Sequence, residues 1–210
     1  MDTRLKTLLE QLHEHGAVHD ADRADRLERL RNLEPGSASL LALLVRATGA
    51  RSVLELGTSN GYSTLWLADA LRDTGGRLVS VDLDGPRSAQ AAQNLERAGL
   101  RELVELRVQD AAETLAGSPP GAWDMIFLDA ERSAYAGYWP DLLRALRRGG
   151  LLAVDNVLSH ADEVAELRAL VQAEGRVSET LVPSGAGVLL VVLELTTTGA
   201  GPEAAEAAGL

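Results

Sequence analysis

From residue 50 onward, short apolar runs alternate with longer segments of helical periodicity. Strands that alternate with helices pack as a parallel sheet, because each crossover helix returns the chain to the same end of the sheet. The strands expected from this pattern are 52–56, 77–81, 103–108, 123–128 and 151–154. The helices expected between and after them are 61–72, 86–98, 111–115, 135–147 and 161–174.

The carboxyl-terminal part of the chain departs from this alternation. Two apolar runs flank a segment typical of a hairpin turn: 177–181 and 188–195, on either side of Pro183-Ser184-Gly185-Ala186-Gly187. The predicted fold is therefore α/β, a Rossmann-like three-layer sandwich whose mostly parallel seven-stranded sheet ends in an antiparallel hairpin. One domain is predicted over 1–195, with its core at 50–195. The tail 196–210 lacks apolar periodicity and is predicted to be disordered.

Residues 1–49 are predicted to form N-terminal helices in front of the core. Four leucines recur at helical spacing and predict an amphipathic first helix: Leu5, Leu8, Leu9 and Leu12. Asp20 is expected to cap a second, charge-rich helix that runs to about Asn32. Ser37 is expected to cap a third helix over 38–48.

Composition narrows the possible functions. The net charge is −11, whereas a nucleic-acid binder normally has a basic face. The densest basic stretch, 23–31, alternates Arg with Asp and Glu, which is typical of a solvated helix, so no nucleic-acid partner is expected. The absence of Cys removes thiolate metal sites and cysteine nucleophiles. Charged residues interrupt 1–12, so neither a signal peptide nor a membrane partner is expected, and the expected location is cytoplasmic.

A cofactor-binding turn is predicted over residues 53–63, VLELGTSNGYS. Gly57 permits a tight turn where a ligand approaches, and Gly61 permits close packing at the helix entrance. The two glycines are four residues apart, and Ser59 occupies the place of a second glycine, which argues against a dinucleotide pyrophosphate. This spacing suits a cofactor with a ribose and an amino-acid tail. Glu55, inside the preceding strand, is expected to have a role in the site.

Acidic residues follow the next two strands. Asp82 ends the second strand, where a carboxylate can accept hydrogen bonds from both ribose hydroxyls. Asp84 is expected to cap the helix that opens at Pro86. Asp110 follows the third strand and can cap the next helix, accept the adenine amino group, or do both.

Two neighbouring strands end in oxygen-bearing side chains. Asp129 follows the run 123–128, and Asp155 and Asn156 follow the run 151–154. Parallel neighbours present their carboxyl ends at one edge of the sheet, so these three side chains should converge beside the cofactor crevice. Oxygen donors without thiolates suit Mg²⁺, Mn²⁺ or Ca²⁺, although Asp and Asn at strand ends often only terminate strands or cap helices.

The region from about Leu33 to Leu195 resembles the class I S-adenosylmethionine-dependent O-methyltransferases of the cation-dependent family, which includes catechol and caffeoyl-CoA O-methyltransferases. The resemblance implies S-adenosylmethionine and a divalent cation as cofactors, and a homodimer. It implies a cofactor site in which each residue has a part: Glu55 at the methionine end, Gly57, Ser59 and Ser63 along the cofactor's path, Asp82 at the ribose, Asp110 and Ala111 around the adenine, and Asp129 beside both cofactor and metal.

One position departs from the family pattern. The family has a Lys, regarded as its general base, three residues after the first metal-binding Asp, and here Arg132 stands in that place. Arginine does not deprotonate in proteins, so Arg132 can stabilise a phenolate while metal and water remove the proton. His160 is either a proton acceptor or a solvated residue. Tyr135, Tyr138 and Trp139 are expected to pack in the core rather than line an acceptor pocket.

The expected function is methyl transfer from S-adenosylmethionine to a hydroxyl of a small phenolic acceptor with vicinal hydroxyls, assisted by the divalent metal and with Arg132 and Asp129 as catalytic residues. A metal would lower the pKa of one hydroxyl and fix its oxygen in line with the methyl group. The alternatives are a metal-independent methyltransferase that acts on another small-molecule nucleophile, a nicotinamide-dependent oxidoreductase, and an inactive binding module.

Overall fold

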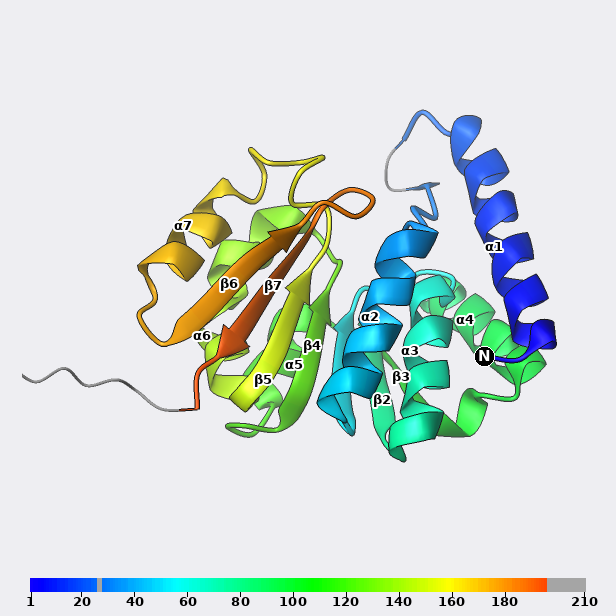
Figure 1. The fold of residues 1–210 in the computed structure, drawn as a ribbon. Coiled ribbons are helices and arrows are strands. Elements are labelled where there is room, and N and C mark those ends of the chain that lie inside the picture. Colours follow the sequence, from blue (N-terminus) through cyan, green and yellow to red (C-terminus); the bar gives the residue numbers. More distant parts are fainter. Residues whose placement is uncertain (26–27, 196–210) are drawn as a thin grey trace, which may run out of the picture.

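The computed structural model describes residues 1–25 and 28–195. Seven strands form a sheet in the order β3-β2-β1-β4-β5-β7-β6, in which β1 to β5 are parallel and β7 is antiparallel to both of its neighbours (Figure 1). The strands are β1 (Ser52–Leu56), β2 (Arg77–Asp82), β3 (Val104–Val108), β4 (Trp123–Leu128), β5 (Leu146–Val154), β6 (Val177–Val182) and β7 (Val188–Leu193). The α-helices are α1 (Thr3–Ala21), α2 (Pro35–Thr48), α3 (Tyr62–Thr74), α4 (Gly85–Ala98), α5 (Ala111–Gly117), α6 (Tyr135–Ala145) and α7 (Ala165–Ala173). The predicted fold class and the terminal hairpin are confirmed.

Both faces of the central strands are buried, which explains their nearly continuous apolar sequences. Val53 and Phe127 pack into the layer formed by α1, α2, α3 and α4. Their chain neighbours Leu54 and Ile126 point the other way, into the layer formed by α5, α6 and α7. Because side chains alternate along a strand, Glu55 faces the same layer as Val53 and lies beneath α3.

The N-terminal segment differs from the prediction. Asp20 lies in the last turn of α1, and no α-helix occurs between α1 and α2 in the described residues. The Asp20 carboxylate accepts hydrogen bonds from the backbone N–H groups of Leu30 (2.7 Å) and Arg31 (2.8 Å), which holds this stretch as a loop. The third predicted helix begins at Pro35 rather than after a Ser37 cap, because proline suits the first helical position, where no N–H is needed.

Two further element boundaries differ from the prediction by more than two residues. The sequence predicts that β5 begins at residue 151, but it begins at Leu146, which pairs with Trp123 before an irregularity in the β4–β5 register. The helix expected over 161–174 is shorter, because α7 begins only at Ala165. None of the helices in the described ranges has the length and apolar character needed to cross a membrane. The predicted disordered tail 196–210 lies outside the described residues.

Candidate active site

A cavity of about 550 Å³ opens at the carboxyl ends of the parallel strands. The connection between α1 and α2 lies at this same end of the sheet (Figure 1). All the predicted site residues except Glu55 line the cavity: Gly57, Ser59, Ser63, Asp82, Asp110, Ala111, Asp129, Arg132, Asp155 and Asn156. The topology therefore brings together residues that are up to about a hundred positions apart in the chain, as ligand sites at strand ends in α/β sheets require.

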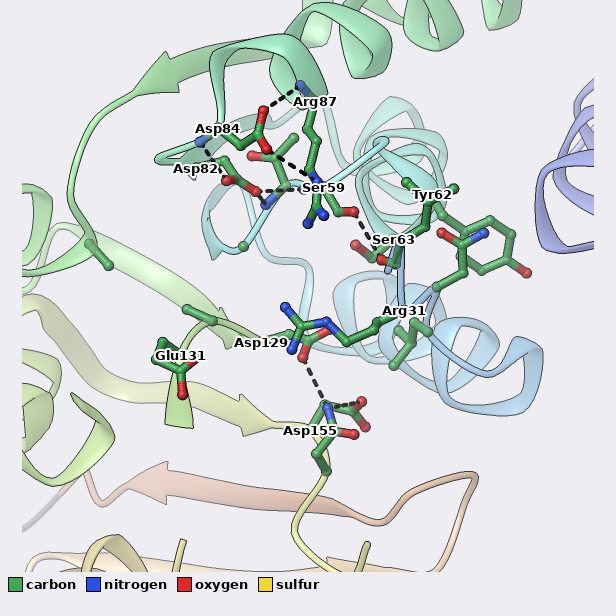
Figure 2. Close-up of a pocket in the computed structure, with 18 of the residues that line it drawn as sticks. Arg31, Ser59, Tyr62, Ser63, Asp82, Asp84, Arg87, Asp129, Glu131 and Asp155 are labelled. Atoms are coloured by element: carbon green, nitrogen blue, oxygen red, sulfur yellow. Dashed lines mark hydrogen bonds and ion pairs between the residues drawn. The ribbon is translucent and has the colours of Figure 1, made fainter. Parts of the chain in front are cut away.

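The turn after β1 is held by one carboxylate. Asp82 Oδ2 accepts hydrogen bonds from the backbone N–H groups of Thr58 (3.0 Å) and Ser59 (2.7 Å), and Oδ1 accepts one from Asp84 N (2.9 Å) (Figure 2). Gly57 has a φ of +108°, and a Cβ there would overlap the carbonyl oxygen of Asp129. Gly57 is thus needed because the neighbouring strand approaches so closely, a requirement that exists before any ligand binds.

Glu55 lies beneath the floor of the cavity and is fully buried. Three hydroxyl groups donate hydrogen bonds of 2.6 Å to its carboxylate, from Ser63, Thr64 and Ser80. Burial raises the pKa of Glu55 to about 7, although the three hydroxyl donors act in the opposite direction. Ser63 lines the cavity, so Glu55 reaches the site through this hydroxyl.

Two acidic residues cap helices at the edge of the cavity. Asp84 accepts a hydrogen bond from Arg87 N at the start of α4, as the sequence predicts. Asp110 accepts hydrogen bonds from the N–H groups of Ala112 (2.7 Å) and Glu113 (3.4 Å) at the start of α5. Asp110 and Ala111 both line the cavity, and the contact of Asp110 with adenine stays a prediction.

Asp129, Asp155 and Asn156 meet at the ends of β4 and β5. The Asn156 amide nitrogen donates to Asp129 Oδ1 (3.0 Å) and to Asp155 Oδ2 (2.9 Å), and so joins the two carboxylates (Figure 2). Asn156 has a φ of +65°, a backbone conformation that few residues other than glycine adopt. Loss of hydration raises the pKa of Asp129 to about 6, and burial together with the charge of Asp129 raises that of Asp155 to about 8.

These three side chains fit a hard divalent cation. Asp155 Oδ1 is buried and has no hydrogen-bond partner within the described residues, which leaves one carboxylate oxygen for a ligand. Carboxylate and amide oxygens are the donors that Mg²⁺, Mn²⁺ and Ca²⁺ prefer. In the described part of the chain no three His, Cys, Asp or Glu side chains cluster as a metal site, and the third oxygen donor beside the two carboxylates is the Asn156 amide.

The whole described core corresponds to one known family. The sequence model of a family described as O-methyltransferase matches residues 4–192. The chain belongs to this O-methyltransferase family. Membership excludes the nicotinamide-dependent oxidoreductase that the sequence left open.

Several members of the family are similar to this chain. It is 38% identical to a catechol O-methyltransferase of Niastella koreensis over 130 residues, which are 60% of this chain and 58% of that protein. It is 39% identical to a catechol O-methyltransferase of Mycobacterium tuberculosis over 128 residues, 60% of this chain and 57% of that one. The chain thus matches less than two thirds of the length of either relative.

Solved structures agree with the fold. An O-methyltransferase from Bacillus cereus in complex with SAH superposes with a TM-score of 0.74 at 29% identity, covering 90% of this chain and 91% of that one. The O-methyltransferase TomG from Streptomyces achromogenes, in complex with SAM, superposes with a TM-score of 0.74 at 28% identity, covering 92% and 91%.

In this member of the O-methyltransferase family, Arg132 is buried near the two carboxylates, with 3% of its side chain exposed. Its Nε donates to Glu163 Oε2 (2.9 Å), while its Nη2 has no hydrogen-bond partner within the described residues. His160 lines the cavity, and its Nδ1 lies 2.8 Å from Ser159 Oγ. Arg132 therefore presents a fixed positive charge to the site.

The sequence predicts that Tyr135, Tyr138 and Trp139 pack in the core, and this is confirmed for Tyr135 and Trp139. Tyr135 is fully buried and its hydroxyl contacts the backbone of Ala130, and Trp139 is buried against the same layer. Tyr138, in contrast, lines the cavity.

Sequence reasoning missed the part of the site that comes from the α1–α2 connection. Residues 29–34, hereafter the strap, all line the cavity. Leu30 and Leu33 are buried, although the position of Asp20 and the alternating charges of 23–31 predict a solvated helix that runs to about Asn32. Pro35 marks the end of that expected helix, but nothing local in the sequence shows that the Asp20 carboxylate binds the backbone of Leu30 and Arg31.

Proposed function

We propose that this protein transfers the methyl group of S-adenosylmethionine to a hydroxyl of a small phenolic acceptor with vicinal hydroxyls, assisted by a divalent cation. The observation that carries the proposal is the meeting of Asp129, Asp155 and Asn156 at adjacent strand ends of the cavity. In a chain of the O-methyltransferase family, this donor set favours a metal-assisted reaction over a metal-independent one.

The cavity residues divide into two groups in this proposal. The Asp82 carboxylate accepts hydrogen bonds from the ribose hydroxyls, because three backbone N–H donors fix it at the edge of the cavity. Asp110 and Ala111 flank the adenine, and Ser63, supported from below by Glu55, lies along the methionine end. Asp129, Asp155 and Asn156 hold the cation and with it the acceptor.

The chemistry needs little from the protein beyond positioning. A divalent cation, when bound, lowers the pKa of a hydroxyl that ligates it. The phenolic oxygen forms a bond to the methyl carbon, the carbon–sulfur electron pair stays on sulfur to give S-adenosylhomocysteine, and the hydroxyl proton passes to water. Arg132 cannot accept that proton, but its fixed charge stabilises the phenolate oxygen.

We extend the proposal to the molecule as a whole. Residues 1–195 act as one domain, with no nucleic-acid or membrane partner, as a homodimer in the cytoplasm. The family resemblance supports the dimer, and the net charge of −11 argues against a nucleic-acid substrate. Size-exclusion chromatography with light scattering tests the dimer directly.

A two-part experiment tests the function. Calorimetry should detect binding of S-adenosylhomocysteine and none of NAD. Methylation of a series of diphenols should stop in EDTA and return with Mg²⁺ or Mn²⁺, and Asp155→Ala should abolish it while S-adenosylhomocysteine still binds. Full activity in EDTA would refute the metal assistance, and absence of S-adenosylhomocysteine binding would refute the cofactor.

A further inference from the structure

Arg31 belongs to the strap, which hydrogen bonds hold in place on two sides. On one side, the carboxylate of Asp20 in α1 accepts hydrogen bonds from the backbone N–H groups of both Leu30 and Arg31. From the cofactor turn, Ser59 Oγ donates to the carbonyl oxygen of Leu30 (3.0 Å). The position of the strap is therefore tied to the same turn that Asp82 organises.

The backbone of Arg31 is strained in a way that positions its side chain. Its φ is +49°, a left-handed conformation that is sterically unfavourable for a residue with a Cβ. Such strain persists where surrounding contacts impose it, as the Asp20 carboxylate does here. The conformation directs the Arg31 side chain into the cavity, where Figure 2 shows its guanidinium beside Asp129.

The two arginines near the carboxylate pair differ in their partners. Arg132 donates through its Nε to Glu163, so a protein carboxylate already holds one side of its guanidinium. No hydrogen bond or ion pair within the described residues engages the Arg31 guanidinium, whose side chain is exposed in the cavity. A planar guanidinium in this setting is prepared to bind a carboxylate through two parallel hydrogen bonds.

We propose that Arg31 is a specificity-determining residue that binds an anionic group of the acceptor, so that diphenols bearing a carboxylate are preferred over neutral diphenols. The inference rests on the proposed function and names its substrate class. An anionic group entering beside Asp129 and Asp155 would meet two carboxylates, and the Arg31 guanidinium adds a positive charge at the place where that group enters. Asp20 is a positioning residue in this scheme, because it acts through the backbone N–H groups of Leu30 and Arg31.

The test compares 3,4-dihydroxybenzoate with 3,4-dihydroxybenzamide, which have the same shape and differ by one negative charge. The ratio of their kcat/KM values is measured at saturating S-adenosylmethionine and Mg²⁺. We expect the parent to prefer the acid, and Arg31→Gln to lower the acid-to-amide ratio about tenfold, mainly through KM. Asp20→Asn should lower the ratio in the same direction. Arg23→Gln is the matched control, since Arg23 is exposed, pairs with Glu28 and does not line the cavity, and it should keep the parental ratio.

Binding supplies a readout that does not depend on turnover. Calorimetry of both diphenols against protein saturated with S-adenosylhomocysteine should give the same acid preference in the parent and its loss in Arg31→Gln. If both diphenols are methylated and Arg31→Gln keeps the parental ratio, the inference is overturned while the proposed function stands. If Arg31→Gln instead weakens S-adenosylhomocysteine binding at an unchanged ratio, Arg31 serves the cofactor and the inference is also overturned. If the parent methylates neither diphenol, the proposed function fails, and the calorimetric acid preference alone decides the role of Arg31.

Discussion

Arg132 places a permanent charge where the family pattern has a group that can accept a proton. Its guanidinium is buried, held by Glu163, and close enough to Asp129 to lower the pKa of that carboxyl. In the proposed reaction, a residue that cannot deprotonate would leave proton removal to the solvent, and the rate would depend on ionisation of the hydroxyl itself.

Substitution of Arg132 separates the effect of its positive charge from the effect of the missing proton acceptor. The rate should rise with pH as the hydroxyl ionises, and Arg132→Ala should lower kcat about tenfold or more because the phenolate loses its counter-charge. Arg132→Lys should keep or raise turnover near neutral pH, because a lysine pKa can fall beside other positive charges and supply a base. One diphenol is measured across pH at saturating cofactor and metal, with thermal melts to verify folding. Parental rates in Arg132→Ala at every pH would make Arg132 a bystander.

The raised pKa of Glu55 predicts how the stability of the protein depends on pH. The pKa of Glu55 rises from the ordinary value of 4.5 to about 7 in the folded protein. Between pH 4.5 and pH 7 the folded protein therefore binds a proton that the unfolded chain does not. Stability from this group is present below pH 4.5 and is lost as the pH rises to about 7. Glu55→Gln should therefore gain stability relative to the parent between pH 5 and 8, by at most about 3 kcal/mol, as measured by urea unfolding.

Glu105 provides a control of opposite sign. Its exposed carboxylate has a lowered pKa because Arg107 donates a hydrogen bond to it. Glu105→Gln should thus lose a little stability relative to the parent as the pH rises through this group's titration range. A pH-independent difference between Glu55→Gln and the parent would mean that Glu55 stays charged in the folded protein.

At the scale of elements, the end of β1 and the end of β4 are packed without space for a side chain between them. A Cβ at Gly57 would overlap the Asp129 carbonyl, and the φ of +108° is itself unfavourable for other residues. Gly57→Ala should destabilise the protein by about 3 kcal/mol or more and displace both the cofactor turn and Asp129. Urea unfolding and S-adenosylhomocysteine affinity measure the two effects.

Gly99 is the matched control for this prediction. It also has a positive φ, +67°, but an added Cβ there would meet nothing within 4 Å. Gly99→Ala should cost only the conformational preference, about 1 kcal/mol, and leave affinity for S-adenosylhomocysteine at the parental value. Equal losses of stability in the two variants would show that the close approach to Asp129 is not what constrains Gly57.

At the scale of the whole molecule, the charge balance is strongly acidic. The chain has 31 Asp and Glu against 20 Lys and Arg, so carboxylates repel one another across the folded surface. Raising NaCl from about 0.02 M to about 0.5 M should screen this repulsion and raise Tm by about 3 °C. The effect should shrink as the pH is lowered toward 4.8, where the net charge vanishes. A Tm that falls with added salt would mean that ion pairs such as Arg46–Asp69 outweigh the repulsion.

The core was predictable because its elements are defined locally. β1 and β4 begin and end at the predicted residues, and α3 and α4 differ from prediction by at most two residues at either end. The errors lie where a long-range contact decides the conformation. Leu146 joins β5 because Trp123 pairs with it, and the strap leaves the helical path because Asp20 binds its N–H groups.

The sequence by itself determined the three-layer α/β fold, the strand-end positions of Asp82, Asp129 and Asp155, and the glycine at the cofactor turn. Periodicity and backbone sterics act between near neighbours in the chain, so they can be found from the sequence. Only the tertiary structure decided that the strap lies over the cavity and that Arg31 points into it. It also decided which groups titrate out of their ordinary range, because desolvation and charge depend on what the fold brings around a side chain. Contacts between residues far apart in the chain produce no periodic pattern in the sequence. The position of the strap and the direction of Arg31 therefore could be found only from the tertiary structure.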